Sequence, residues 1–195
     1  MRLIFLRHPE TTANEQNLIY GKTDYPYTKR GQKQFEEALV NIERFGFDKI
    51  LTSPLRRAYE LASAIASKTS KELIVHEALE EMNFGIFEGL TEEEAKLKHP
   101  GIHRDFVDCF ETTLFPEGES FDIFKKRVES FLNDYKQSET DWLVVSHGGF
   151  IRTALEYLLD NKSGSSWFLE IGNCSIIEIH VNEGKPSMIK NILNP

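Results

Sequence analysis

The sequence has few cysteines, no long apolar run and no block of basic residues. Its two cysteines, Cys109 and Cys174, stand far apart, which disfavours a disulfide-stapled fold and favours a reducing cytoplasm. The sequence has no run of about 18 apolar residues, so no membrane span is predicted. The apolar stretch at the N-terminus is too short for a secretory signal. The net charge is −8, so nucleic acid and anionic membranes are poor partner predictions.

Several enzyme motifs are also absent. The sequence holds no G-x-S-x-G turn of a serine hydrolase, no Walker A loop and no glycine-rich dinucleotide loop. Neither cysteine has an arginine six residues later, which argues against a cysteine phosphatase. His99 and His103 have the spacing of a helical metal pair, but Pro100 and Gly101 lie between them, so no metal site is predicted.

The apolar pattern that is present alternates between short strands and amphipathic helices, without repeats or flexible linkers. We expect a single domain over residues 1–195, with α/β layers around a mostly parallel sheet. Alternating apolar residues near the C-terminus, with turn residues at 184–186, predict an antiparallel hairpin. We expect strands at residues 2–6, 48–52, 73–75 and 142–145. We expect helices after the N-cap Thr28, around residues 58–65, 121–132 and 151–158, and from residue 91 to before residue 100.

Polar side chains follow the predicted strands at their carboxyl ends. Right-handed crossovers bring these ends to one edge of a parallel sheet, where open α/β sheets bind ligands. The sequence therefore predicts a site with two histidines, at least two arginines and a carboxylate. The residues delivered to this edge are Arg7 and His8, Ser53 to Arg57, Glu80 to Asn83, and Ser146 to Gly149.

These residue types are suited to phosphoryl transfer. Guanidinium groups match phosphate oxygens, and the N–H groups at a helix N-terminus add further donors. One histidine can attack phosphorus through a neutral ring nitrogen, while a second, when protonated, holds an equatorial oxygen. A carboxylic acid can protonate the departing alkoxide. The set predicts a reaction through a phosphohistidine.

The first of these segments also matches a known signature. Residues 7–14, R-H-P-E-T-T-A-N, resemble the R-H-G-E-T-x-x-N signature of the histidine phosphatase superfamily, in its phosphoglycerate-mutase-like branch. The resemblance continues in the family's order through residues 21–24, 28–31, 53–58, 81–85, 116–120 and 146–149. It implies a three-layer αβα sandwich and a phosphatase of the small type, similar to α-ribazole phosphatases and broad-specificity phosphatases.

The resemblance also implies roles for particular residues. His8 is the expected nucleophile and Glu81, rather than Glu80, the expected proton donor. Arg57, rather than Arg56, is the expected catalytic arginine of the α-helix that follows Ser53. The remaining expected site residues are Arg7 and His147 in the phosphate pocket, with Asn14, Gly21 and Gly148 contacting substrate. The family implies no cofactor and no metal.

Two of the departures from the family pattern bear on the site. Pro9 replaces a usual glycine, and because proline fixes its own φ it is expected to stiffen the nucleophile. Tyr20 stands where mutases tend to carry Ser or Thr, which disfavours a mutase-type substrate contact.

The sequence thus predicts hydrolysis of a small phosphomonoester that it does not identify. Residues 91–119 are expected to form a lid over the pocket and to set substrate choice. This segment holds only Lys96, Lys98 and Arg104 as cations, too few to retain a second anionic group as a mutase must. Phosphoglycerate-mutase-type transfer and a non-catalytic phospholigand-binding protein remain alternatives, and the sequence leaves the oligomeric state open.

Overall fold

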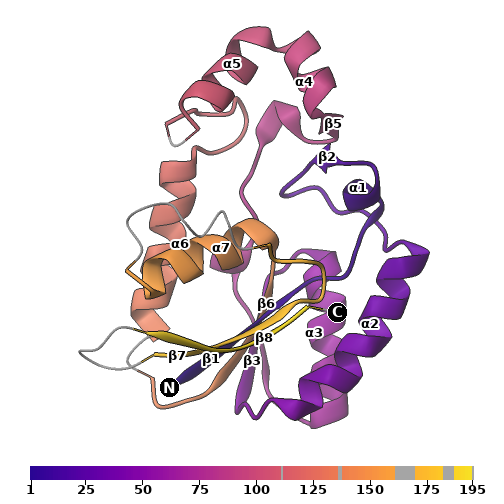
Figure 1. Cartoon of the computed structure of the whole chain (residues 1–195), viewed down its shortest axis with the longest axis vertical. Helices are drawn as coiled ribbons and strands as arrows, with labels where there is room; N and C mark the ends of the chain where they lie inside the picture. The colour runs from indigo at the N-terminus through magenta and orange to yellow at the C-terminus, as the bar shows by residue number, and fades with distance from the viewer. Residues whose placement is uncertain (111, 136–137, 161–169, 182–186, 195) are drawn as a thin grey trace.

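A six-stranded sheet forms the centre of the chain in the computed structural model, which describes residues 1–110, 112–135, 138–160, 170–181 and 187–194 (Figure 1). The order across the sheet is β4 (Leu73–Val75), β3 (Lys49–Thr52), β6 (Trp142–Ser146), β1 (Arg2–Arg7), β7 (Ile176–His180) and β8 (Met188–Leu193). Strands β1, β3, β4 and β6 pair in parallel, whereas β7 pairs antiparallel with both β1 and β8. The predicted mostly parallel sheet and its antiparallel C-terminal pair are confirmed; the turn predicted at 184–186 lies outside the described residues.

Helices cover both faces of this sheet, as the strand pattern requires. Helices α2 (Lys29–Asn41) and α3 (Arg56–Thr69) lie on one side, and α6 (Phe121–Tyr135) and α7 (Gly148–Leu158) on the other (Figure 1). Along β1 the side chains alternate between two cores: Ile4 and Leu6 pack toward α2 and α3, while Leu3 and Phe5 pack toward α6 and α7. The predicted αβα sandwich is therefore confirmed.

Local capping chemistry explains where several helices begin. The Thr28 hydroxyl accepts a hydrogen bond from the Gly31 N–H at the start of α2. Thr91 and Glu94 form a capping box at the start of α4 (Glu92–Lys98), which ends before Pro100 as predicted. The sequence did not predict the next helix, α5 (Pro100–Asp108), because Pro100 indicated only a stop. Proline is well suited to a first helical position, where its missing N–H costs no hydrogen bond.

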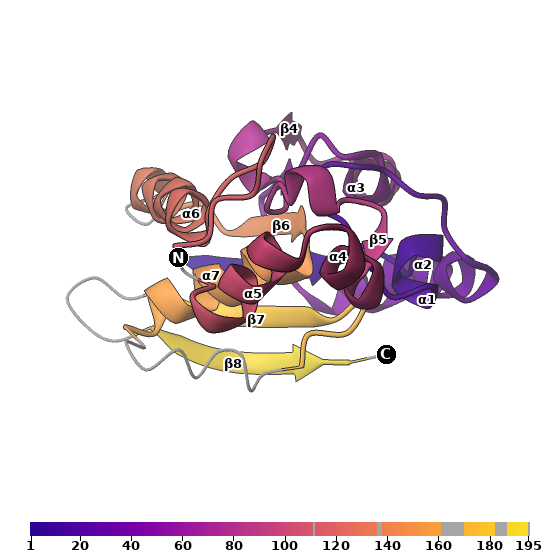
Figure 2. The same cartoon turned by 90° about the horizontal axis from the view of Figure 1, so that it is seen from above.

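The segment with α4 and α5 stands apart from the sheet, above its carboxyl edge (Figure 1). A small antiparallel pair of strands, β2 (Leu18–Ile19) and β5 (Leu90–Thr91), lies at its base and was not predicted. Viewed from above, α4 and α5 project over the strands (Figure 2). The remaining short elements are α1 (Thr12–Glu15) and the 3-10 helices η1 (Ile42–Arg44), η2 (Glu77–Leu79) and η3 (Gly85–Phe87).

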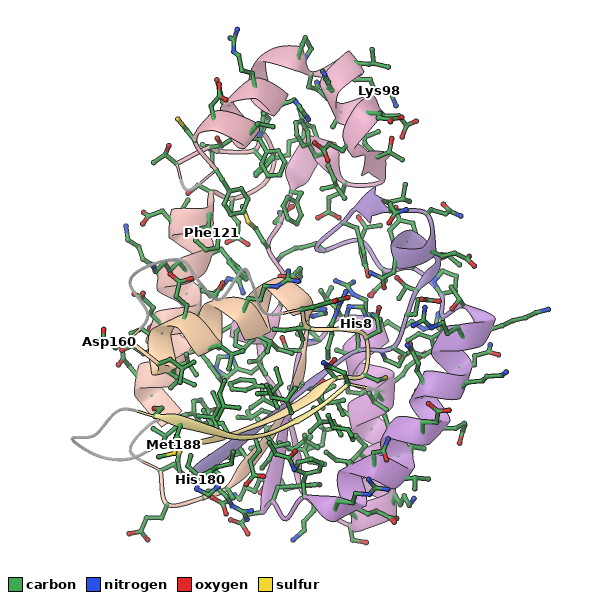
Figure 3. The ribbon with its side chains drawn as sticks, in the orientation of Figure 1. His8, Lys98, Phe121, Asp160, His180 and Met188 are labelled. Carbon is green, nitrogen blue, oxygen red and sulfur yellow. The ribbon has the colours of Figure 1, made fainter. Side chains whose placement is uncertain are left out.

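Four parallel strands end at the edge that faces this segment, so the residues after them meet there. The chain leaves β1 into His8, β3 into Ser53 and β6 into His147. Figure 3 places His8 at the edge of the sheet below α4 and α5, with Lys98 at the far end of that segment. Among the described residues, no helix has the length and apolar character needed to cross a bilayer.

Candidate active site

A cavity of about 310 Å³ opens at the carboxyl edge of the sheet. Its walls come from β1, β2, α3, the segment after β4, α5 and α7, which are far apart in the sequence. One part of the lining is cationic and another apolar. The lining residues are Arg7, His8, Leu18, Ile19, Tyr20, Arg57, Glu81, Phe84, Phe106, Gly148, Gly149 and Arg152.

His8 is fixed in a single orientation directly after β1. Its Nδ1 lies 2.7 Å from the Pro9 carbonyl oxygen, which can only accept, so Nδ1 carries the proton and donates. Burial, together with the guanidinium groups of Arg57 and Arg7, holds the pKa of His8 well below its usual range. The ring is therefore neutral at pH 7, and Nε2 keeps its lone pair for attack.

Arg57 is a fully buried guanidinium held by two backbone carbonyl oxygens and one carboxylate. Its Nη1 donates to the Thr23 carbonyl (3.1 Å) and to Asp24 Oδ1 (3.0 Å), and its Nη2 donates to the Gly21 carbonyl. The Tyr20 ring lies beneath it, with the guanidinium carbon 4.8 Å from the ring centroid.

The neighbouring arginine of α3 points elsewhere. Arg56 is exposed and donates from Nε to Glu60 at 2.6 Å. Of the two arginines that the sequence offered at this position, Arg57 is therefore the one that lines the cavity.

Arg7 reaches the cavity from the end of β1. Its Nη1 donates to the Ile171 carbonyl at 2.6 Å, and burial lowers its pKa, although a guanidinium stays charged at pH 7. Within the described part of the chain, the buried Nε atoms of Arg7 and Arg57 have no hydrogen-bond partner. Unpaired buried donors are costly, and a bound oxyanion would satisfy them.

His147 lies behind His8 at the N-cap of α7. The two ring centroids are 5.2 Å apart, and His147 Nε2 lies 2.8 Å from the Ser53 hydroxyl oxygen. Its buried Nδ1 has no partner among the described residues, and His147 does not itself line the cavity. Burial and the charge of Arg57 hold the pKa of His147 well below its usual range, so His147 is neutral at pH 7.

Glu81 is held at the cavity by backbone donors. Its Oε2 accepts from the Gly149 N–H at 2.8 Å, and its Oε1 accepts from the Met82 N–H at 3.1 Å. A side chain at Gly149 would bring a Cβ to 2.4 Å from Glu81 Oε1, so the close approach requires glycine. Glu80 instead pairs with Lys22 at 2.6 Å and does not line the cavity.

Two of the predicted substrate contacts lie outside the lining, whereas Gly148 is part of it. Asn14 Oδ1 accepts from the Thr11 N–H at 3.0 Å and from the Tyr20 hydroxyl at 2.9 Å. Gly21 supports Arg57 through its carbonyl oxygen. In this geometry Asn14 and Gly21 support residues of the cavity.

Sequence reasoning missed several lining residues. The sequence marks Tyr20 only as a departure from mutases, and no motif marks Arg152 as a site residue. Arg152 follows Gly148 by four residues on α7, and this spacing places both on one helix face. That spacing was a usable signal. The apolar residues Leu18, Ile19 and Phe84 carry no motif that sequence reasoning could have used.

Residues 91–119 were expected to form a lid over the pocket, and Phe106 of α5 does line the cavity. Arg104 of the same segment is exposed and lies outside the lining. His103 is buried against α4, where its Nε2 lies 3.6 Å from Glu92 Oε1, and His99 stacks on Phe87. No group of three or more His, Cys, Asp or Glu side chains suited to a metal ion occurs within the described ranges.

Comparison with known proteins places this geometry in context. A model of the histidine phosphatase superfamily (branch 1) matches residues 3–192. Phosphoserine phosphatase 1 from Hydrogenobacter thermophilus is 29% identical over 97% of this chain and 91% of its own. The structure of α-ribazole phosphatase from Shigella flexneri has a TM-score of 0.88 at 27% identity, covering 97% of this chain and 95% of the other. A mutant phosphoserine phosphatase from Entamoeba histolytica in complex with phosphoserine has a TM-score of 0.82 at 29% identity, covering 98% and 95%.

Proposed function

We propose that this chain, which belongs to the histidine phosphatase superfamily (branch 1), hydrolyses a small phosphomonoester through a phosphohistidine on His8. The observation that carries this proposal is the His8 Nδ1–H bond to the Pro9 carbonyl, which leaves Nε2 as the unprotonated ring nitrogen at the cavity. A non-catalytic binding protein would need neither this nucleophile nor a carboxyl group beside it.

The proposed reaction has two balanced steps. Nε2 of His8 forms a bond to phosphorus as the phosphorus–oxygen ester bond breaks, and protonated Glu81 gives its proton to the leaving oxygen. Water then attacks the phosphohistidine, Glu81 takes the water proton, and inorganic phosphate leaves. Arg7 and Arg57 hold the phosphoryl oxygens from the cavity wall, and the unpaired Nδ1 of His147, directly behind His8, is proposed to contact one of them once the phosphoryl group is bound. Positioning and charge neutralisation then supply most of the rate, and the chemistry needs no metal ion.

Trapping of the intermediate tests the mechanism. Quenched-flow mixing with a ³²P-labelled phosphomonoester should yield acid-labile protein-bound label in the wild-type protein and none in His8→Ala. Activity should persist in EDTA. Label that persists in His8→Ala, or activity that EDTA abolishes, would contradict the mechanism.

The cavity lining also supports a substrate class. Arg7 and Arg57 supply guanidinium donors for the phosphoryl group, and Arg152 adds a third guanidinium to the lining of the same cavity. The apolar wall with Phe84 and Phe106 is suited to a leaving group that has no extended polar surface. We propose a small phosphomonoester whose leaving group carries a carboxylate, a class that includes the phosphoserine bound by the Entamoeba histolytica neighbour.

Two substrates that differ only in the carboxylate test the role of Arg152. In Arg152→Met, KM for O-phosphoserine should rise by about 10-fold to 100-fold, the size of one lost charge-assisted hydrogen bond, while KM for O-phosphoethanolamine changes little. Arg104→Met, which removes an exposed arginine outside the lining, is the matched control and should affect neither substrate. Equal losses for both substrates in Arg152→Met would assign Arg152 to the phosphoryl group instead.

The third cation also keeps phosphoglycerate-mutase-type transfer as a second candidate. A mutase must retain a second anionic group, and Arg152 could contribute to that, although the lid adds only Phe106 to the lining from its described residues. In an assay primed with 2,3-bisphosphoglycerate, we expect phosphate release to exceed exchange between 3- and 2-phosphoglycerate. Faster exchange than release would favour the mutase.

A further inference from the structure

We infer that Glu88 is a positioning residue that fixes the Arg57 guanidinium in the cavity, although Glu88 lies outside the lining. The inference rests on the proposed function, since it assumes that Arg57 holds the phosphoryl group. Glu88 follows η3, and its side chain is half-buried beneath residues 21–24.

The Glu88 carboxylate gathers the N–H groups of that loop. Its Oε1 accepts from the N–H groups of Gly21 (3.1 Å) and Lys22 (2.8 Å), and its Oε2 accepts from the Thr23 N–H at 2.7 Å and from the Thr23 hydroxyl. The Phe84 N–H adds a longer contact to Oε1 at 3.3 Å. An ionised carboxylate only accepts, so one side chain satisfies several donors that would otherwise have to find water.

The opposite side of the same loop faces Arg57. The carbonyl oxygens of Gly21 and Thr23 accept from the two Nη atoms of the guanidinium. The loop therefore lies between an anion and a cation, with its N–H groups directed at one and carbonyl groups at the other.

One peptide group connects the two charges directly. In the peptide between Gly21 and Lys22, the N–H donates to Glu88 Oε1 and the carbonyl oxygen accepts from Arg57 Nη2. A negative charge on the donor side polarises the peptide and strengthens the bond on its acceptor side. Glu88 thus acts on Arg57 through a single hydrogen-bonded peptide.

The loop has little room to take another position. A Cβ on Gly21 would lie 1.6 Å from the Met82 carbonyl oxygen, so the loop packs directly on the backbone that follows Glu81. Glu88 therefore sets the position of the phosphate-holding arginine relative to the segment that carries the proposed proton donor.

Glu88→Gln is the test variant, because glutamine keeps the size of the side chain but removes the charge and turns one acceptor into a donor. Displacement of a positioned group by about 1 Å costs on the order of 100-fold in rate. We expect kcat/KM for p-nitrophenyl phosphate to fall by about 10-fold to 100-fold and inhibition by vanadate to weaken. Glu94→Gln is the matched control, since Glu94 accepts from the backbone and hydroxyl of Thr91 in the lid and should leave activity unchanged.

A double-mutant cycle separates positioning from general stability. If Glu88 acts through Arg57, adding Glu88→Gln to Arg57→Ala should cost little beyond the loss in Arg57→Ala alone. An equal loss in both backgrounds, or no loss in the wild-type background, would overturn the inference.

A milder variant and the trapped label complete the test. Should Glu88→Gln fail to fold, Thr23→Val is the milder variant, because it removes only the hydroxyl that donates to Glu88. A loss of kcat/KM that occurs only when Arg57 is intact supports the inference. A loss that is the same with and without Arg57 contradicts it. Trapping of the phosphohistidine separates failure of the proposed function from failure of this inference. Absence of label in the wild-type protein contradicts the proposed function, whereas the double-mutant cycle on Glu88 and Arg57 tests only the positioning.

Discussion

Four side chains at the candidate site each hydrogen-bond through some of their polar atoms and, within the described residues, leave another polar atom without a hydrogen bond. His8 uses Nδ1 and keeps Nε2, whereas His147 places Nε2 against Ser53 and leaves Nδ1 unpaired within the described chain. Arg7 and Arg57 use their Nη atoms on backbone carbonyls and leave Nε without a partner there. Since unpaired buried polar atoms are costly, we expect an oxyanion to bind where these atoms meet.

Glu81 offers a test at the level of a single proton. A general acid matters most when the leaving group is poor, so Glu81→Gln should reduce hydrolysis of alkyl phosphates by about 100-fold to 10,000-fold and of aryl phosphates far less. Steady-state rates on a matched pair such as propyl and p-nitrophenyl phosphate measure the difference.

Glu80 is the internal control for that experiment. It is the preceding residue and has the same side chain, but it pairs with Lys22 outside the cavity. Glu80→Gln should lack the dependence on leaving group. If Glu80→Gln shows that dependence and Glu81→Gln does not, the roles assigned to the two carboxylates are reversed.

Among the elements, the sequence predicts best those whose ends carry their own chemistry. The parallel strands were predictable as short apolar runs that are followed by polar residues, and Thr28 and Thr91 mark the starts of α2 and α4. The parallel direction of these strands followed from the rule of right-handed crossovers, so the edge that gathers His8 and His147 could be foreseen.

The elements that the sequence missed are those that depend on tertiary contacts. The β2–β5 pair is only two residues long on each side and has no periodicity to detect. Helix α5 begins at a proline that also ends α4, so one residue serves both signals. Arg152 and Tyr20 line the cavity without a family motif, and Asn14 and Gly21 match the motif while lying behind the lining.

The α4–α5 segment makes a prediction of its own. We propose that residues 91–119 act as a lid that sets substrate choice, because Phe106 reaches the cavity from α5 and packs against Phe87 and Phe115. Phe106→Ala should change KM by different factors across a series of phosphomonoesters, since it removes wall area that contacts the leaving group. Vanadate, which has no leaving group, should inhibit the variant as it inhibits the wild type.

The neighbouring residue provides the control for the lid. Val107 belongs to the same helix but is 60% exposed, so Val107→Ala should leave the substrate profile unchanged. A flat profile in Phe106→Ala, or an equal change in both variants, would assign the segment a purely structural role.

At the scale of the whole molecule, the cavity carries charge of the opposite sign to the net charge of the chain. The net charge is −8, yet the cavity is lined by Arg7, Arg57 and Arg152 with Glu81 as its one acidic lining residue in the described structure. Anion binding therefore depends on short contacts inside the cavity and not on long-range attraction, because exposed charges beyond about 10 Å are largely screened at 0.1 M salt.

Keeping His8 and His147 neutral also makes the stability of the whole molecule depend on pH. Both have a pKa below the usual value of 6.5, so just below pH 6.5 the unfolded chain binds protons that the folded chain does not. Stability is therefore full above pH 6.5 and falls as the pH falls, by up to about 1.4 kcal/mol per pH unit for each histidine. Urea unfolding between pH 5.5 and 7.5 should show this slope, which should flatten in the His8→Asn/His147→Asn double variant. An unchanged slope in that variant would show that other groups control the pH dependence.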